Sequence, residues 1–292
     1  MIFLDHLING LSLGSIYAII ALGYTMVYGI AKMLNVAHGD VIMVGAYIAF
    51  CGLQYWGVPP VLAILLAMVV CTVLGITIEG LAYRPLRQAT SLAVLITAIG
   101  MSYLLQNIAL MIWGANPKSF PTTFINGGSL HLGQLSISSA TLITILVSIV
   151  IMTALTLFTA KTKLGKAMRC VSEDRGAAEL MGINVNRTIS VTFAIGSSLA
   201  AIAGVLLCSS YPILQPTTGS MPGIKAFTAA VFGGIGSIPG AMLGGILLGV
   251  IEIFGKAYIS TELGDAIVFA VLIIVLLFKP AGLLGKPMRE KV

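Results

Sequence analysis

The chain has 292 residues, of which 58% are hydrophobic and only 9% are charged. Its mean hydropathy is +1.04, and apolar runs such as 142–160 and 266–278 approach or match the roughly 20 residues that a helix needs to cross a bilayer. This composition excludes a soluble domain. The net charge of +6 lies mainly in loops beside the apolar runs, so it indicates membrane topology and no nucleic-acid partner.

Nine apolar segments follow one another along the chain. None shows the alternation of a barrel strand, and in lipid only helices or closed barrels satisfy every backbone group. The sequence therefore predicts an all-α fold, a polytopic helical membrane bundle of about nine spans in one domain over residues 1–292. No basic stretch precedes the first run, so we expect this span to be retained rather than cleaved. The predicted spans are 7–30, 36–53, 59–80, 91–113, 138–160, 189–210, 224–237, 239–258 and 264–279.

The second predicted span begins with a glycine-broken segment, NVAHGDVIMVGAY, at residues 35–47. Such interruptions are typical of helices that break within the membrane and line a transport path. We therefore take Asn35, His38, Gly39 and Asp40 as candidate residues of a translocation path. Asp40 has two interpretations: it caps exposed amide groups at the helix start, or it shapes a polar gate.

Residues 161–187 form the one long polar stretch between apolar runs and hold nine charged residues. The positive-inside rule predicts that this basic loop is cytoplasmic. Alternation of the spans then places loop 114–137, whose only basic residue is Lys118, outside. The N-terminus is predicted outside and the C-terminus inside, which requires an odd number of spans. The other basic residues placed inside are Lys32, Arg84, Arg87, Lys279, Lys286, Arg289 and Lys291.

The second half of the chain repeats features of the first. A span rich in small residues, FAIGSSLAAIAGVL at 193–206, precedes a glycine-broken segment, FGGIGSIPGAMLGG at 232–245. Matched interruptions of this kind are typical of inverted repeats around a transport path, here two four-span halves joined by span 138–160. Close helix packing alone is the alternative reason for the small residues. The second segment adds four candidate path residues, Gly233, Gly234, Gly236 and Ser237.

Motifs of enzyme active sites are missing. No Gly-Lys pair has the context of a phosphate-binding loop, neither HExxH nor GxSxG occurs, and the three histidines are too dispersed for a metal site. We therefore expect no catalysis and no cofactor. Glu79 with Arg84 and Glu252 with Lys256 are predicted to be structural pairs near the membrane interface. With so few ionisable groups in its spans, the chain is a poor candidate for an ion-coupled carrier.

Four strings of the sequence carry a resemblance to a known family. They are INGLSLGSIYAIIALGYTMVYGI at 8–30, LNVAHGDVIMVGAY at 34–47, AAELMGIN at 177–184 and GGIGSIPGAMLGG at 233–245. Over nearly its whole length the chain resembles the permease subunits of bacterial branched-chain amino acid importers of the ATP-binding cassette class. The same broad group includes urea, amide, sugar and nucleoside permeases.

The resemblance implies a permease subunit in the bacterial inner membrane, with its N-terminus in the periplasm and its C-terminus in the cytoplasm. Two separate ATPase subunits would bind ATP, a second permease, by resemblance a paralogue, would complete the path, and a periplasmic protein would select Leu, Ile or Val. The alternatives are a permease for urea, amides or another small solute, and an ATPase-independent secondary transporter. No Arg and Asp pair lies at mid-membrane, so we expect a low-affinity path, with loops 114–137 and 211–223 as docking surfaces.

Permeases of this class insert a short cytoplasmic coupling helix into a groove of the ATPase, and the resemblance places it at 170–182, within loop 161–187. Ser172 can cap such a helix and Gly182 can end it. The alternative, a solvated basic loop, explains the lysines but not this order of residues. The predicted coupling residues are Ser172, Glu173, Asp174, Arg175, Ala177, Ala178, Leu180, Met181 and Gly182.

Overall fold

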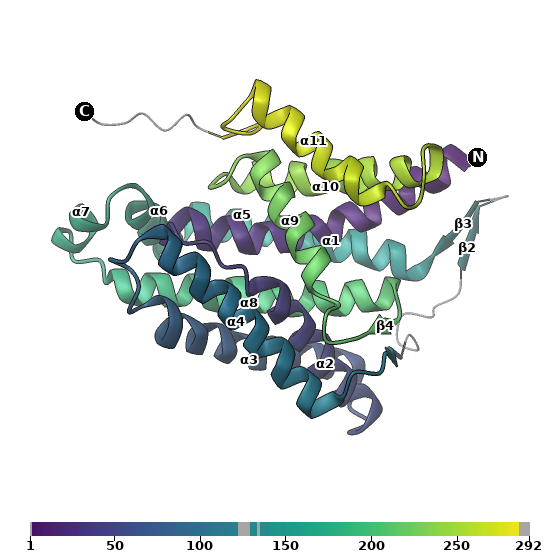
Figure 1. The fold of residues 1–292 in the computed structure, drawn as a ribbon, viewed down its shortest axis with the longest axis horizontal. Coiled ribbons are helices and arrows are strands. Elements are labelled where there is room, and N and C mark those ends of the chain that lie inside the picture. Colours follow the sequence, from purple (N-terminus) through teal and green to yellow (C-terminus); the bar gives the residue numbers. More distant parts are fainter. Residues whose placement is uncertain (1, 122–128, 133–134, 286–292) are drawn as a thin grey trace.

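The computed structural model describes residues 2–121, 129–132 and 135–285, so Lys286, Arg289 and Lys291 lie outside the described residues. The helices are α1 (Ile2–Ala31), α2 (His38–Gln54), α3 (Pro60–Ile78), α4 (Ser91–Trp113), α5 (Ser139–Lys161), α6 (Lys163–Glu173), α7 (Arg175–Leu180), α8 (Val185–Ser210), α9 (Ser220–Gly233), α10 (Ile238–Tyr258) and α11 (Gly264–Phe278). The other elements are the π-helix η1 (Glu79–Tyr83) and the strands β1 (Lys118–Ser119), β2 (Ser129–Leu132), β3 (Leu135–Ser138) and β4 (Ile213–Leu214). Helices such as α1, α5, α8 and α10 run side by side along the long axis, α9 crosses them at a steep angle, and small strand pairs lie at one end (Figure 1).

All nine predicted spans contain a helix, but the helices differ in length. Among the described residues, six are long and apolar enough to cross a bilayer: α1, α3 with η1, α4, α5, α8 and α10. The other three, α2, α9 and α11, have 17, 14 and 15 residues. These are shorter than the roughly 20 residues that a straight span requires. An all-α membrane bundle is therefore confirmed, whereas a count of nine full spans is not.

The helices α2 and α9 begin inside the bundle rather than at one of its ends (Figure 1). Lys32, at φ +53°, directly follows α1 in a left-handed conformation that often terminates helices, and the chain continues without helix to His38. The start of α9 lies against the start of α2: a Cβ placed on Gly39 would be 2.8 Å from the carbonyl oxygen of Gly219. The N-terminal ends of two short helices therefore meet within the protein.

The helix α1 lies at the centre of the bundle. It packs against α8, α9 and α10, and 94% of its most apolar stretch is buried, so it faces protein rather than lipid. Glycines form its seam with α10: a Cβ on Gly14 would be 2.6 Å from the carbonyl oxygen of Ile246, and one on Gly10 would be 2.9 Å from the Cα of Val250. Small residues at such a seam let two helix backbones approach closely in a membrane.

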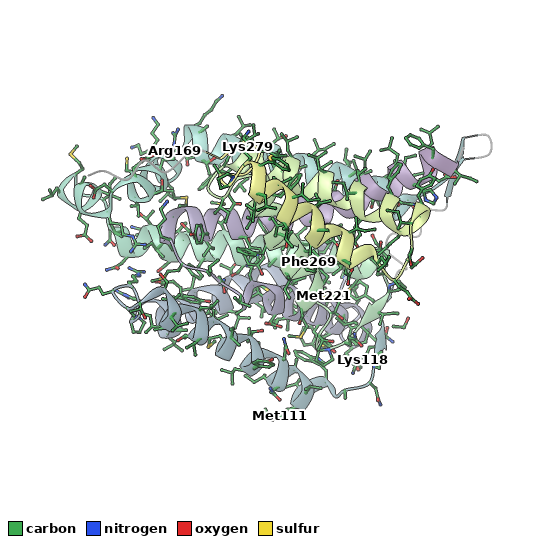
Figure 2. The ribbon with its side chains drawn as sticks, turned by 45° about the horizontal axis from the view of Figure 1, so that its top comes forward. Met111, Lys118, Arg169, Met221, Phe269 and Lys279 are labelled. Carbon is green, nitrogen blue, oxygen red and sulfur yellow. The ribbon has the colours of Figure 1, made fainter. Side chains whose placement is uncertain are left out.

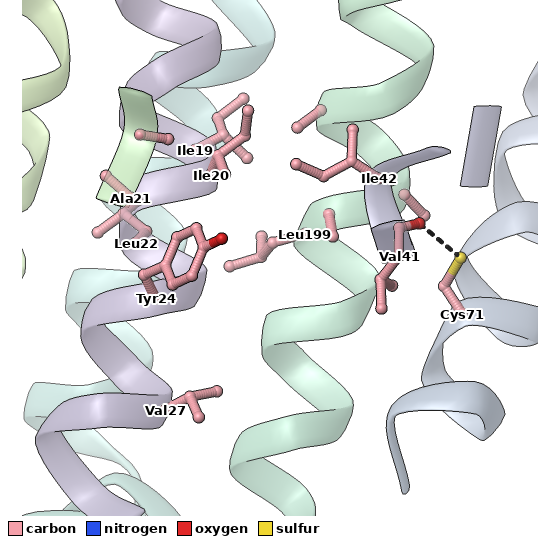
Figure 3. Close-up of a cluster of buried hydrophobic side chains, with 14 of the residues drawn as sticks. Ile19, Ile20, Ala21, Leu22, Tyr24, Val27, Val41, Ile42, Cys71 and Leu199 are labelled. Atoms are coloured by element: carbon pink, nitrogen blue, oxygen red, sulfur yellow. Dashed lines mark hydrogen bonds between the residues drawn. The ribbon is translucent and has the colours of Figure 1, made fainter. Parts of the chain in front are cut away.

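Apolar side chains fill the space between α1, α2, α3 and α8. Figure 3 shows Tyr24 of α1 and Leu199 of α8 between the backbones of these two helices, with the label of Ile42, from α2, on the side of α8 away from α1. The thiol of Cys71 on α3 donates a weak hydrogen bond to the carbonyl oxygen of Val41, at 3.6 Å (Figure 3). These contacts fix the start of α2 against both halves of the chain.

The outer helices α3, α4 and α5 present an apolar belt. Only 28%, 17% and 22% of their most apolar stretches are buried. Large side chains such as Val69, Leu104 and Leu146 are more than half exposed. A water-facing surface with this many apolar side chains would aggregate, so the belt faces lipid or another membrane subunit.

Two strand pairs close one end of the bundle. β1 pairs antiparallel with β4, with Lys118 opposite Leu214, and β2 pairs antiparallel with β3. The ring of Phe120, directly after β1, is buried. The pair β1–β4 thereby ties the segment after α4 to the segment between α8 and α9.

Candidate transport path and coupling surface

The meeting point of α2 and α9 is built from glycine. In addition to Gly39 and Gly219, Gly223 has no room for a side chain, because its Cβ would be 2.8 Å from the Cα of Gly39. Each helix start carries backbone N–H groups without helical partners and the positive end of a helix dipole. Backbone therefore packs directly against backbone at this point, and the two helix dipoles give it a positive electrostatic bias.

Asp40, in the first turn of α2, places a buried carboxylate at this point. Its Oδ1 accepts a hydrogen bond from Gln106 Nε2 of α4 at 2.8 Å, and the same nitrogen donates to Ser220 Oγ of α9 at 3.2 Å. No salt bridge between described residues includes Asp40. The carboxylate thus joins three helices through neutral partners, which is compatible both with a capping charge and with a polar gate.

Asn35 and His38 lie beside Asp40, as their closeness in sequence requires. The side-chain oxygen of Asn35 accepts a hydrogen bond from the hydroxyl of Tyr83 on η1, at 3.0 Å. The ring of His38 packs edge-on against that of Tyr24, with ring centroids 4.7 Å apart. Both residues are almost fully buried, so they position the start of α2 within the bundle.

The second predicted group of path residues does not join the first. Gly233, Gly234, Gly236 and Ser237 form the turn between α9 and α10. Here Ser237 caps α10 by accepting a hydrogen bond from the N–H of Gly240, at 3.2 Å. A Cβ on Gly29, near the end of α1, would be 3.3 Å from the Cα of Gly236. The turn therefore lies at the end of the bundle that holds the C-terminus of α1.

The structure places another segment against segment 35–47, and a path role of Gly233, Gly234, Gly236 and Ser237 stays a prediction. Segment 232–245 connects two helices at one end of the bundle, whereas segment 211–223 enters the bundle and starts α9 beside α2. Glycine content alone favours segment 232–245, because it has more glycines than segment 211–223. Segment 211–223 is distinguished by the contact between Gly219 and Gly39, which only the tertiary structure shows.

The charged loop 161–187 folds into two helices, α6 and α7, rather than one. The expectation that Ser172 caps the second helix is wrong: its hydroxyl donates to the carbonyl oxygen of Arg169 within α6, at 2.7 Å. Asp174 is the cap instead, in extended backbone, and its Oδ1 accepts a hydrogen bond from the N–H of Ala177 at 3.1 Å. Gly182, at φ +80°, follows the end of α7 as the sequence predicts.

The helix α7 projects farther from the bundle than its neighbours (Figure 1) and presents apolar side chains at its tip. Leu180 is 91% exposed and Met181 is 82% exposed, while Glu173 and Ala177 are exposed beside them. Ala178 alone of the predicted coupling residues is buried, at 3%. An apolar tip with an acidic side, fixed at one point, is suited to insertion into a groove of another protein.

Arg175 connects α7 to the C-terminal end of the central helix α1. Its guanidinium donates a hydrogen bond to the carbonyl oxygen of Ala31, the last residue of α1. Burial, and then the positive charge of Arg87, lower the pKa of Arg175 from its ordinary value. The side chain therefore faces α1 and the neighbouring helices, and it does not belong to the exposed tip of α7.

The structure also assembles a buried group of charges, of which the sequence indicates only one pair. The carboxylate of Glu252, 1% exposed, accepts hydrogen bonds from Lys225 at 2.7 Å, from Lys256 at 2.6 Å and from the hydroxyl of Tyr17 at 2.8 Å. Lys225 also lies 2.6 Å from Asp265. These residues come from α1, α9, α10 and α11. The predicted pair of Glu252 with Lys256 is thus present, but its carboxylate is inside the protein.

A third buried carboxylate lies on η1. Glu79, 1% exposed, pairs with Arg87 and not with Arg84, the partner that the sequence suggests. It also accepts a hydrogen bond from the hydroxyl of Ser190 on α8, at 2.6 Å. Arg87 donates in addition to the side chain of Asn186. This cluster fastens the end of α3 to the start of α8, and no periodicity in the sequence could have revealed it.

Comparison with known proteins assigns the chain to a family. Residues 6–276 match the family described as the branched-chain amino acid transport system permease component. The chain belongs to the branched-chain amino acid permease family. The permease BraD of Pseudomonas aeruginosa, from a high-affinity branched-chain amino acid transport system, is 47% identical over 99% of this chain and 98% of its own. The corresponding LivH permeases are 46% identical in Salmonella typhimurium and 45% identical in Escherichia coli K12, with the same coverage.

More distant relatives transport other solutes. The ribose import permease RbsC of Haemophilus influenzae is 28% identical over 85% of this chain. An autoinducer 2 import permease of Escherichia coli, LsrD, is 26% identical over 93%. Within the branched-chain amino acid permease family, the near-complete alignment with BraD and LivH includes every candidate residue discussed above. The relatives are transport permeases rather than enzymes.

The exposed tip of α7 gives a first testable prediction. Leu180→Ser and Met181→Ser should each reduce ATP-dependent uptake at least tenfold, because they remove apolar surface that would enter an ATPase groove. Both side chains are more than 80% exposed, so the free energy of unfolding should change by no more than about 0.5 kcal/mol. Uptake and transport-stimulated ATP hydrolysis in proteoliposomes measure the effect. Ile259→Ser, at another exposed apolar residue, just after α10, is the matched control and should transport normally.

Proposed function

We propose that this chain is a transmembrane permease subunit of an ATP-binding cassette importer for branched-chain amino acids. The observation that carries the proposal is the 45–47% identity to high-affinity branched-chain amino acid permeases over essentially the whole chain. The partners would be two cytoplasmic ATPase subunits, a second permease of paralogous sequence and a periplasmic binding protein. ATP would be bound by the ATPases and not by this chain.

We propose an orientation with α7 in the cytoplasm. Figure 2 shows Arg169 and Lys279 toward one end of the molecule and Lys118 toward the other. The end that carries α6 and α7 holds most of the described basic residues, in agreement with the positive-inside rule. They are Lys32, Arg84, Arg87, Lys161, Lys163, Lys166, Arg169, Arg175, Arg187 and Lys279. The opposite end, with β1–β4, would face the periplasm and the binding protein.

This orientation can be tested with a natural reporter. Of the four cysteines, only Cys170 on α6 is exposed, and the other three are buried. In intact cells an impermeant maleimide should leave the wild-type protein unlabelled and should label a Cys170→Ser, Lys118→Cys variant. Inverted vesicles should give the reverse pattern. Labelling of both sites from the same side would contradict the proposed topology.

We further propose that α1–α4 and α8–α11 are inverted halves related by a two-fold axis through the contact of Gly39 with Gly219. In this relation α1, α2 and α3 correspond to α8, α9 and α10, and equivalent pairs of helices pack together. α1 packs against α10, and its equivalent α8 packs against α3. Likewise α2 packs against α3, and α9 packs against α10. The buried carboxylates of Glu79 and Glu252 follow the same relation. Glu79, just after α3, bonds to α8, and Glu252, near the end of α10, bonds to α1. Inverted halves that meet at broken helices are the usual arrangement for alternating access.

The proposed mechanism uses these links. The Glu79 cluster fastens the two halves at the cytoplasmic end, and the Glu252 cluster fastens them toward the periplasmic end. When the ATPases close, they would move α7, and Arg175 would transmit the movement to the end of α1. A ligand shifts such a two-state system only by its different affinity for the two states. Solute would pass by the backbone-lined starts of α2 and α9 and the carboxylate of Asp40.

Reconstitution of the full transporter tests the proposal. Proteoliposomes with both permeases, both ATPases and the binding protein should accumulate leucine only when ATP is supplied on the cytoplasmic side. Uptake of urea or amides in place of leucine would favour the other solute class in this group. Leucine uptake that follows an ion gradient without the ATPases would favour a secondary transporter.

A further inference from the structure

A cavity of about 500 Å³ lies at the end of the bundle proposed to be periplasmic. It is bounded by the N-terminal part of α1, the start of α5 and the ends of α8 and α10, away from the contact of Gly39 with Gly219. Its volume falls within the range of small-molecule sites, roughly 300–1,000 Å³. Neither the transport path nor the coupling surface described above accounts for it.

The cavity has one cationic wall and no acidic one. Lys256 lines it, whereas no Asp or Glu is among its described lining residues. The Nζ of Lys256 is held from behind by Glu252 at 2.6 Å, and the side chain remains 34% exposed. An ammonium group fixed in this way can still donate to a ligand. Because Glu252 neutralises part of its charge, an anionic group would bind it weakly and leave readily.

The remaining lining is divided into an apolar and a polar part. Leu13 and Ile16 of α1 are buried and form an aliphatic surface with Ile253 of α10. Hydroxyl groups, among them Ser209 and Ser210 of α8, supply hydrogen-bonding groups. The Oγ of Ser210 is buried and has no hydrogen-bond partner among the described residues. An unpaired buried hydroxyl costs free energy unless a ligand or water satisfies it.

We propose that this cavity is a binding site for an α-amino acid with an aliphatic side chain, whose carboxylate contacts Lys256 and whose side chain contacts Leu13 and Ile253. The site rests on the proposed function, since it would receive solute released by the binding protein before the solute reaches the starts of α2 and α9. The ammonium group of Lys256 can pair with the carboxylate of such a ligand, the aliphatic surface can contact its side chain, and the hydroxyl oxygens of the lining can accept hydrogen bonds from its α-ammonium group. The partial neutralisation of Lys256 suits a site that passes solute onward.

Binding of radiolabelled leucine to the permease–ATPase assembly in nanodiscs, without binding protein, tests the proposal. Wild type should bind leucine saturably. Ala140→Phe, which fills the cavity from α5, and Lys256→Met should each raise the Kd at least tenfold, and Ser210→Ala should raise it by a smaller factor. Ala154→Phe, at an exposed position of the same helix, is the control and should leave the Kd unchanged. Isocaproate, which keeps the carboxylate, should compete with leucine, whereas isoamylamine should not.

The outcomes separate this site from the proposed function. If the complete transporter accumulates leucine but the assembly binds none, or Ala140→Phe binds as wild type does, the site is wrong and the function stands. If native mass spectrometry finds a phospholipid that Ala140→Phe expels while leucine binding persists, the cavity is a lipid site and the proposal is overturned. Absence of leucine uptake by the complete transporter would instead refute the proposed function.

Discussion

Replacement of Glu252 by alanine should lower the free energy of unfolding by about 3–5 kcal/mol, because it leaves a buried cation without its main partner. Lys225 is 6% exposed and would retain only Asp265. Tyr17 and Lys256 would lose their acceptor as well. Since these contacts join four helices, uptake should fall with stability. Thermal unfolding of the permease in nanodiscs, followed by circular dichroism, measures the change.

A double variant distinguishes the ion pair from simple loss of packing. Glu252→Leu combined with Lys225→Met should be much more stable than either single variant, because a buried ion pair can often be replaced by apolar residues at little cost. The partners left over, Lys256 and Asp265, have side chains that reach solvent. Glu262→Ala, at an exposed carboxylate before α11, is the control and should be neutral. Equal effects of the Glu252 and Glu262 variants would contradict the role of the cluster.

Gly219→Ala should abolish uptake. A Cβ at this position would overlap the carbonyl oxygen of Gly39, and backbone atoms cannot move aside as a flexible side chain does. The φ of Gly219 is −85°, which any residue can adopt, so the expected effect is steric alone. Because the contact holds the starts of α2 and α9 together, the variant should separate them even where the membrane helices still fold. Uptake at matched membrane levels is the measurement.

Two other glycines serve as comparisons. A Cβ on Gly100, within α4, would meet no described atom within 4 Å, so Gly100→Ala should transport normally and gain up to about 1 kcal/mol of helix stability. Gly236 also has space but sits at φ +91°, so Gly236→Ala should be strained by roughly 1–2 kcal/mol and transport partially. Gly204 of α8 cannot serve as a control position that accepts alanine, because a Cβ there would meet the carbonyl oxygen of Ile42. Normal uptake by Gly219→Ala would refute the steric argument.

Much of the fold could be predicted because hydropathy fixes where helices lie in a membrane protein. Each predicted apolar segment contains a helix, and the left-handed glycine at the end of the predicted coupling segment, Gly182, was recognisable from its position. The depth at which α2 and α9 begin within the bundle was not predictable. The apolar length of α2 and α9 resembles that of a short span, and their starts inside the bundle depend on contacts between residues far apart in sequence, such as Gly39 and Gly219.

The candidate sites were predictable to the extent that they are local. Loop 161–187 was identified by its charge, yet the choice of Asp174 over Ser172 as the cap depends on where the chain becomes extended. The Glu252 cluster needed Lys225, which lies 27 residues away on another helix. Likewise, Glu79 pairs with Arg87 rather than the nearer Arg84 because Asn186 and Ser190 of α8 approach the same cluster. Long-range pairs of this kind leave no periodic signal.

The continuity of α1 has a mechanical consequence. This one helix has 30 residues, and at 1.5 Å per residue it is a rod of about 45 Å. Arg175 holds the C-terminal end of α1, which we propose to be cytoplasmic, and at the other end the ring of Phe3 packs edge-on against that of Phe254, 5.1 Å between centroids. A movement of α7 would therefore be transmitted across the membrane by the hydrogen-bonded backbone of α1 alone. No series of side-chain rearrangements would be needed along the way.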